Sequence, residues 1–292
     1  MGYKTPDQVA FAAVDAGVAK ANLTPARMLS GGILAGAYIA FAGLLGIVVT
    51  AGLKPDAWGN LPTLIFGAVF SLGLILVVIA GSELVTGNMA LLPLALFARR
   101  ASVGRAGLSL LIVTVGNLIG ALFVAYFFAV ETGVIGSADS AAGTAGALTF
   151  AKLAAVAKGK ALTETTGQIF LRAIGCNWLV CLAVWMAFAA QDISGKILAI
   201  FFPIMGFVAM GFDHVVANMF FLPAALFAHV PGITAGNVVN NLIFAFLGNL
   251  VGGGVFVAGF YWFQYLRGRD AATPTARVQN SYSAHEQVAT AN

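Results

Sequence analysis

The chain has 292 residues, of which 60% are hydrophobic and 9% are charged, and its formal net charge is +4. Average soluble proteins carry roughly 25% charged residues, so this composition excludes an ordinary soluble globular protein. The expected surroundings are a lipid bilayer, because apolar segments of about 20 residues are long enough to cross one. The small positive charge does not indicate binding to nucleic acid.

Residues 1–27 are expected to form a short cytoplasmic helix that lies on the membrane surface. Thr5 suits the N-cap, Pro6 the first helical position and Asp7 the first turn. The following QVAFAAVDAGVAKANL is only mildly amphipathic, which favours an interfacial helix over a span. The segment lacks the basic, apolar and cleavage regions of a signal peptide. A tail without structure is the alternative.

Six apolar segments follow and predict an all-α transmembrane domain over residues 28–266. They lie at about 28–50, 61–98, 106–130, 164–190, 195–229 and 236–266. The second and fifth are too long for one plain crossing and contain polar, glycine-containing stretches, so we expect both to be broken. The longest connection, 131–164, ends in LTFAKLAAVAKGK, whose spacing predicts a short surface helix. The polar segment 267–292 is predicted to be a disordered cytoplasmic tail.

The basic residues predict the orientation of the chain. With six spans both termini lie on one side, and placing that side in the cytoplasm gives it ten basic residues against four. The ten are Lys4, Lys20, Arg27, Arg99, Arg100, Arg105, Lys196, Arg267, Arg269 and Arg277, and the four are Lys54, Lys152, Lys158 and Lys160. The positive-inside rule predicts a multi-pass protein of the plasma (inner) membrane with cytoplasmic termini.

A motif occurs twice in the chain. Residues 81–93 read GSELVTGNMALLP and residues 211–223 read GFDHVVANMFFLP, an offset of 130 (211 − 81) without a gap. A second pair, GNLIG at 116–120 and GNLVG at 248–252, has an offset of 132 (248 − 116). The repeat unit is therefore three spans, at about 28–130 and 164–266. Three crossings reverse the chain, so we expect an inverted repeat with a transport site near the middle of the bilayer.

The repeated motif carries an acid in each copy, Glu83 and Asp213. An ionised carboxylate in lipid is costly, so each acid must face protein or water and find hydrogen-bond donors. We interpret both acids as structural groups that hold the two breaks through backbone N–H groups, and Asn88 and Asn218 as further parts of the breaks. Direct contact with a substrate is the alternative.

Four strings together resemble the formate/nitrite transporter family over roughly residues 5–267. They are GSELVTGNM, CNWLVCLAVWMA (176–187), GFDHVVANMFFLP and GNLVGGGVF (248–256). The resemblance implies an aquaporin-like bundle of six spans, with the second and fifth broken, a pore in each protomer and a ring of five protomers. It implies transport of small monovalent anions of weak acids: formate, nitrite, hydrosulfide and, in some branches, acetate or lactate. The strings GSEL-x-TG and CNWLVCLA favour nitrite over formate.

The resemblance also assigns residues. The central pore histidine falls on His214, the threonine of the first break on Thr86 and the pore asparagine on Asn177. The apolar constrictions fall on Leu84, Val85 and Val180 and on Phe70, Leu74 and Phe207. The lysine of the outer mouth falls on Lys160, with Lys158 left open because the spacing to Asn177 is one residue off the family pattern. The acid before the histidine, commonly Glu, is Asp213, which shortens its reach.

His214 is the residue in which we expect the transport chemistry. Burial disfavours the charged imidazolium, whereas an arriving anion favours it. We expect a shared or transferred proton, so that the solute passes the next constriction as a neutral acid. The alternative is a structural histidine. The alternatives for Thr86 and Asn177 are a loop hydroxyl bonded to backbone and an interhelical asparagine. Either lysine would concentrate anions at the mouth or be an ordinary solvated lysine.

Other function classes fit the sequence less well. A membrane haem subunit typically needs paired histidines on facing spans, and only His214 lies in an expected span. A water or glycerol channel would carry paired Asn-Pro-Ala, where this chain has Asn-Met. Cys176 and Cys181, five residues apart on one helix, predict neither a disulfide nor a metal site. Without a nucleophile–base pair or a phosphate loop, we expect no enzyme activity and no cofactor.

Overall fold

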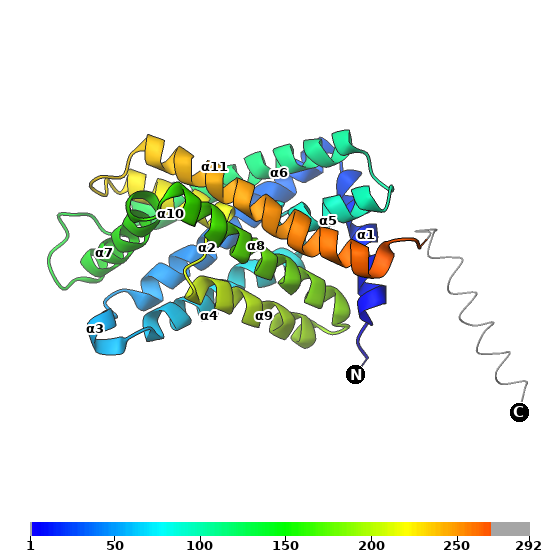
Figure 1. Ribbon diagram of the computed structural model, residues 1–292. Coiled ribbons are helices and arrows are strands. Elements are labelled where there is room, and N and C mark those ends of the chain that lie inside the picture. Colours follow the sequence, from blue (N-terminus) through cyan, green and yellow to red (C-terminus); the bar gives the residue numbers. More distant parts are fainter. Residues whose placement is uncertain (1, 270–292) are drawn as a thin grey trace, which may run out of the picture.

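The computed structural model describes residues 2–269, which are almost entirely helical (Figure 1). Most of the expected tail, residues 270–292, lies outside the described residues. Long helices run side by side, with α1 at one end and α3 and α7 at the other. In chain order the helices are α1 (Pro6–Ala21), α2 (Pro25–Thr50), α3 (Pro55–Trp58), α4 (Leu61–Leu76) with η1 (Val77–Gly81), α5 (Val85–Phe97), α6 (Val103–Phe123) with η2 (Val124–Glu131), α7 (Ala145–Lys158) with η3 (Gly159–Thr163), α8 (Thr166–Ala189), α9 (Ile193–Ala209), α10 (Val215–Phe227) and α11 (Ala235–Val251) with η4 (Gly252–Gly259) and η5 (Trp262–Leu266).

Five helices of the described part are long and apolar enough to cross a membrane. They are Pro25–Thr50, Leu61–Gly81, Val103–Glu131, Thr166–Ala189 and Ala235–Leu266. The expected segment 195–229 is divided into two shorter apolar helices, α9 and α10, and the segment 61–98 is likewise divided by a non-helical step before α5. Six crossings result only if α9 and α10 together make one crossing.

Both divisions of the long segments begin at a glycine of the repeated motif. The helical backbone before α5 ends at Gly81, and Gly211 follows the end of α9. Both have a positive φ, 82° and 72°, which residues with a side chain rarely adopt. A methyl group built on either glycine would meet nothing within 4 Å. The glycine is therefore required by the backbone conformation and not by a lack of space.

The glycines of the second repeated pair bring helices into backbone contact. A Cβ atom at Gly120 of α6 would lie 2.0 Å from the carbonyl oxygen of Ile33 in α2. A Cβ atom at Gly252 would lie 2.4 Å from the carbonyl oxygen of Ile174 in α8. Small residues allow this close approach between helices in membranes, where packing replaces the hydrophobic effect as the driving force. The motif Gly-Asn-Leu-x-Gly is thus a helix-packing device.

Helix α1 packs against the bundle with one of its faces. Its N-cap is Thr5, whose side chain accepts from the backbone N–H of Gln8. The buried residues Val9, Ala13 and Val14 share a hydrophobic cluster with Ala90, Leu91 and Leu94 of α5. The interfacial position expected for this helix stays a prediction, but its inward face is fixed by α5.

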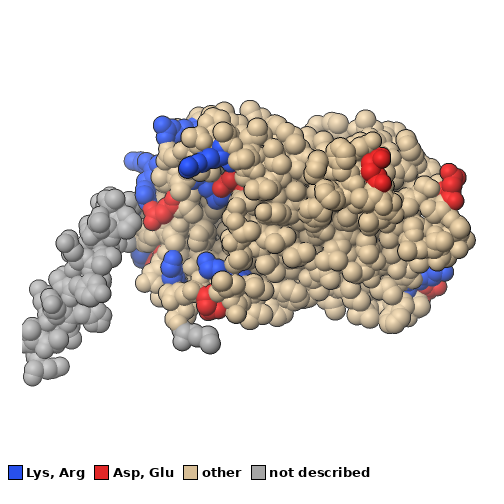
Figure 2. Space-filling view, turned by 180° about the vertical axis from the view of Figure 1, so that it is seen from behind, with Lys and Arg blue, Asp and Glu red and all other residues tan. Residues whose placement is uncertain are grey.

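The charged residues are distributed unequally along the molecule. Figure 2 shows Lys and Arg side chains gathered at the end that carries α1 and a broad region without charges beside it. Large apolar side chains such as Leu111, Leu171 and Phe202 are exposed on the long helices. An uncharged surface of this width fits contact with the hydrocarbon of a bilayer.

Candidate functional site

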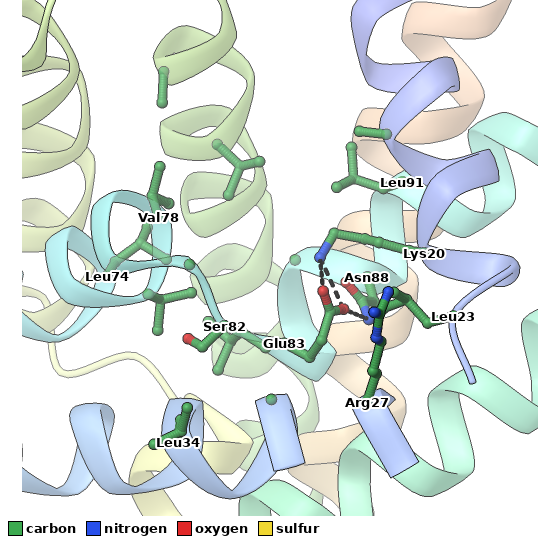
Figure 3. Close-up of a pocket in the computed structure, with 18 of the residues that line it drawn as sticks. Lys20, Leu23, Arg27, Leu34, Leu74, Val78, Ser82, Glu83, Asn88 and Leu91 are labelled. Atoms are coloured by element: carbon green, nitrogen blue, oxygen red, sulfur yellow. Dashed lines mark hydrogen bonds and ion pairs between the residues drawn. The ribbon is translucent and has the colours of Figure 1, made fainter. Parts of the chain in front are cut away.

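Two cavities enter the bundle from opposite ends. The α1-side cavity has a volume of about 580 Å³ and is lined by residues that include Lys20, Arg27 and Glu83 (Figure 3). The α7-side cavity has a volume of about 240 Å³ and is lined by residues that include Lys152 and Lys160. Basic side chains at both mouths raise the local concentration of anions.

A small void of about 10 Å³ lies between the two cavities. It shares Leu74 and Leu84 with the α1-side cavity, and Phe70, Phe207 and His214 with the α7-side cavity. Its walls are Ile39, Phe70, Leu74, Leu84, Val180, Ile204, Phe207 and His214. The two cavities and the void therefore follow one path, and its narrowest part is apolar except for one imidazole.

The hydrogen bonds of His214 define its tautomer. The side chain is the N-cap of α10, and its Nδ1 accepts from the backbone N–H of Ala217 at 3.2 Å. Because Nδ1 is used as an acceptor, the neutral ring carries its proton on Nε2. Nε2 lies 2.9 Å from Oγ1 of Thr86, so it donates to that hydroxyl. His214 is 3% exposed and lines the void, while its Nε2–H group is turned toward Thr86.

Thr86 and Asn177 lie behind the imidazole, and neither is among the residues that line the three cavities. The Asn177 amide donates to the carbonyl oxygen of Thr86 at 3.1 Å and to that of Asn249 at 2.7 Å. Cys181 contacts the same Thr86 carbonyl, and both cysteines are buried free thiols. Asn177 thus fixes the first break, and its N–H groups have partners within the bundle.

The break next to α1 is held by a lysine, an acid and two asparagines. Glu83 accepts from Lys20 with both carboxylate oxygens at 2.8 Å and from Asn88 at 3.1 Å, as Figure 3 shows. The backbone of the break is held by Asn117, which accepts from the N–H of Val85 and donates to the carbonyl of Glu83. The asparagine of the Gly-Asn-Leu motif therefore binds the first break.

The break next to α7 repeats these bonds with other residues. Asp213 accepts from Lys160 and from Asn218, each at 2.8 Å. Asn249 accepts from the N–H of Val215 at 2.8 Å and donates to the carbonyl of Asp213 at 2.9 Å. The two acids thus accept from lysine and asparagine side chains. The backbone N–H groups that we expected as their partners instead bond to Asn117 and Asn249.

Comparison with known proteins identifies the family. The sequence profile of the family described as "Formate/nitrite transporter" matches residues 7–263. The chain belongs to the formate/nitrite transporter family. It is 51% identical to an uncharacterized transporter, YrhG, of Bacillus subtilis, over 91% of this chain and 95% of that one. It is 48% identical to a probable formate transporter of Methanothermobacter thermautotrophicus, over 91% of this chain and 98% of the relative.

More distant family members include characterised channels. The formate channel BtFdhC of Bacillus thuringiensis is 42% identical, over 90% of this chain and 96% of its own. The nitrite transporter NirC of Salmonella typhimurium is 34% identical, over 79% and 80% of the two chains. A solved pentameric formate channel with formate bound superimposes with a TM-score of 0.70 at 31% identity, covering 83% of this chain and 98% of that one.

Five of the six expected constriction residues meet at the central void, which Phe70, Leu74, Leu84, Val180 and Phe207 line together. Leu74 and Leu84 also line the α1-side cavity, whereas Val85 is buried outside the void. Their role as constrictions stays a prediction. Lys160 lines the α7-side cavity and is paired with Asp213, while Lys158 is exposed outside this cavity.

Four residues of this path were not anticipated from the sequence. Ile39 and Ile204 line the void, Lys20 pairs with Glu83, and Lys152 lines the α7-side cavity over the ring of Phe66 at 5.8 Å. Burial lowers the pKa of Lys152, and none of the ion pairs within residues 2–269 includes this lysine. Lys152 lies eight residues before Lys160, about two helical turns, and this spacing was the available signal.

The described residues 2–269 contain no group of three His, Cys, Asp or Glu side chains arranged to hold a metal ion. Of the described residues that line the path, basic side chains lie at both mouths, apolar side chains surround the void, and His214 contributes an imidazole there. Apolar constrictions of this kind exclude water and hydrated ions.

Proposed function

We propose that each chain forms a pore for small monovalent anions of weak acids, with formate as the first substrate to test. One observation carries the proposal: within residues 2–269, His214 is the single polar side chain that lines the apolar void between two cavities with basic mouths. Two relatives named for formate are 48% and 42% identical to this chain, against 34% for the nitrite transporter NirC. This ranking favours formate over the nitrite that the sequence strings favoured.

The proposed path begins at the α7 side, which we assign to the outside. Lys152 and Lys160 attract the anion, and Phe70 and Phe207, whose rings pack edge to face at 6.2 Å, strip its water. At the void the Nε2–H of His214 donates to the anion instead of Thr86. Sharing of this proton offsets part of the anion's charge. Where the ring has first taken up a second proton from water in the α7-side cavity, transfer of the Nε2 proton neutralises the anion and returns the ring to neutral imidazole, so that the solute passes Leu74 and Leu84 as an acid.

The surrounding residues then have supporting roles in this proposal. Thr86 accepts the hydrogen bond from the imidazole N–H when no anion is bound. An arriving anion replaces Thr86 as the acceptor of this bond. Asn177 keeps the Thr86 carbonyl in place. Glu83, Asp213, Asn88 and Asn218 hold the two breaks through side-chain bonds.

Nitrite is the second candidate substrate. It is a bent anion with two terminal oxygens, like formate, so the same N–H donor serves both. The void of about 10 Å³ favours these small anions, and hydrosulfide, over lactate or acetate. A neutral-solute pore is disfavoured by the lysines of both mouths.

The assembly and topology are part of the same proposal. We assign six crossings, with α9 and α10 as halves of one, two inverted repeats, both termini in the cytoplasm and a location in the plasma membrane. The matching bonds of Asn117 and Asn249 support two related halves. The likeness to a pentameric formate channel supports a homopentamer. Native mass spectrometry should then give a particle of five chains of 30.0 kDa each.

Flux in proteoliposomes tests the proposed function. We expect the wild-type protein to carry formate and nitrite, and His214→Asn to lose at least about a hundredfold in flux, the lower end of general-acid contributions, with an altered pH profile. His229→Asn is the matched control, because His229 is an exposed loop histidine and asparagine tolerates its positive φ of 55°. Unchanged pH dependence and selectivity in His214→Asn would refute the proton-sharing role.

A further inference from the structure

Two buried carboxylate oxygens face each other in the wall of the α7-side cavity. Asp213 accepts from Lys160 and Asn218 with Oδ1, while its Oδ2 has no hydrogen-bond donor within residues 2–269. Glu164, between η3 and α8, accepts from Arg172 with Oε1, and its Oε2 also has no donor in this described part. The side chains of Glu164 and Asp213 are in hydrogen-bonding contact.

This contact needs a proton. Two ionised carboxylates at hydrogen-bond distance repel each other, and both facing oxygens would keep unmatched lone pairs in a buried place. One proton between them removes the repulsion and gives both oxygens a hydrogen-bond partner. Both acids have a basic partner, but Lys160 beside Asp213 is 14% exposed whereas Arg172 beside Glu164 is 39% exposed. Water screens the second pair more strongly, so the negative charge stays on Asp213. The proton therefore belongs to Glu164, whose side chain is 9% exposed.

We propose that Glu164 and Asp213 form a one-proton site in the wall of the α7-side cavity, and that loss of this proton slows the access of anions from that side. The second half of this statement rests on the proposed anion transport. Glu164 and His214 line the same cavity, so an ionised Glu164 adds a negative charge along the path that the anion takes to the imidazole. The released proton leaves through the cavity to water.

The site changes charge near neutral pH. Burial and the neighbouring Asp213 raise the pKa of Glu164 to about 7, while Lys160 and Arg172 act in the opposite direction. Glu164 is therefore neutral below this pH and negative above it. The titratable and charged groups around the pair are Asp213, Lys160, Arg172, Lys152, Cys176 and His214.

The other end of the path has no counterpart of this site. Both oxygens of Glu83 are bonded to Lys20, and one of them also accepts from Asn88. Glu83 is the sole acid that lines the α1-side cavity within the described residues. The control by protons is therefore expected at one mouth only.

Infrared spectroscopy of the protein in lipid tests the proton site without any transport. We expect a carbonyl band of a protonated carboxylic acid that disappears as the pH rises through about 7. The band should be missing in Glu164→Gln, whose amide can donate to Asp213 in place of the acid. A wild-type spectrum without a band that titrates near neutral pH, or the same band in Glu164→Gln, would overturn the site.

Exchange of labelled formate at equal pH on both sides tests the control of access. Formate is almost fully ionised between pH 5.5 and 8.5, so the supply of anion stays constant. We expect wild-type exchange to fall about tenfold above pH 7, the effect of one charge roughly 10 Å from the path at an effective dielectric constant of about 20. Glu164→Gln should keep the exchange rate high at alkaline pH.

Two further variants separate this control from a merely structural role. Arg172→Gln removes a charge that favours ionised Glu164, so the fall in exchange should move to higher pH. Asp139→Asn removes an acid from the loop before α7 that does not line the cavity, and it should keep the wild-type midpoint. An unchanged midpoint in both Glu164→Gln and Arg172→Gln would overturn the control of access. A wild-type protein without formate or nitrite exchange would instead refute the proposed function and leave the infrared test intact.

Discussion

The two breaks of the bundle are held by the same set of residue types, but they differ in the residue that stands before the following helix. Each has a positive-φ glycine, an acid bonded to a lysine and an asparagine, and a second asparagine that binds the backbone. At the position before the helix, however, the first break has Leu84 and the second has His214. The shared residues therefore stabilise an interrupted helix in both halves, and a titratable side chain stands before the helix at one of the two breaks.

The acids of the two breaks also differ in their surroundings. Glu83 is 14% exposed and meets its lysine with both oxygens, whereas Asp213 is fully buried and meets its lysine with one. The shorter side chain of Asp213 leaves its second oxygen to Glu164. One methylene fewer in the acid thus coincides with a second acid in the wall.

Removing the lysine of each break should give the largest difference between them. Lys160→Met leaves the fully buried Asp213 without its cation, which we expect to lower the free energy of unfolding by about 3–5 kcal/mol. Lys20→Met should cost about 1–2 kcal/mol, because Glu83 keeps Asn88 and partial access to water. Equilibrium unfolding in mixed micelles measures both. Equal losses would contradict the structural difference between the breaks.

The close contacts of Gly120 and Gly252 with a neighbouring helix should stabilise the two halves of the bundle equally. Substitution of each glycine tests this equality. Gly120→Ala and Gly252→Ala each force a methyl group against a carbonyl oxygen of the neighbouring helix, so each should destabilise by about 1–3 kcal/mol. Gly104→Ala, in the same helix as Gly120 but with nothing within 4 Å of its Cβ, is the control. Thermal unfolding in detergent measures these losses. A loss in one of the two variants alone would show that only one half depends on this packing.

The smallest expected effect concerns the lysines at the mouth of the α7-side cavity. Lys152 lines the α7-side cavity without an ion pair in the described part of the chain, so Lys152→Gln should raise the half-saturating formate concentration about two- to fivefold at low salt. The effect should shrink at high salt, because added ions screen the charge. The exposed Lys158, replaced by Gln, is the matched control. An equal effect of both substitutions would place the attraction in the overall charge of the loop.

The repeat in the sequence predicted where the chain breaks, because a positive φ demands glycine and a buried acid demands a partner. The sequence could not predict the partners themselves. Lys20 and Lys160 lie 63 and 53 positions from their acids, and nothing in a pattern of local spacing connects them. The same limit applies to Glu164, which lies in a connection and meets Asp213 only after folding.

Pore-lining positions were predictable only through the family resemblance. Apolar residues that pack and apolar residues that line a path look alike in a sequence, so Val85 was expected at a constriction although it does not line the void, while Ile39 and Ile204 were missed. Asn117 and Asn249 were visible as a repeated pair, but their bonds to the breaks follow from the way α6 and α11 cross the motif. Spacing along a helix does not show which backbone an amide will meet.

The bond between Thr86 and His214 has a further consequence for what the pore rejects. Thr86 is the second residue of α5 and His214 caps α10, so the bond brings the N-terminal ends of two 13-residue helices together at the narrowest point. Each such end carries a partial positive charge from its aligned peptide dipoles. A dehydrated cation would meet two positive poles and an imidazole N–H here, and the neighbouring carboxylate of Asp213 is already paired with Lys160. Charge selection would then come from the peptide backbone, and replacing surface lysines should leave the exclusion of sodium and potassium intact.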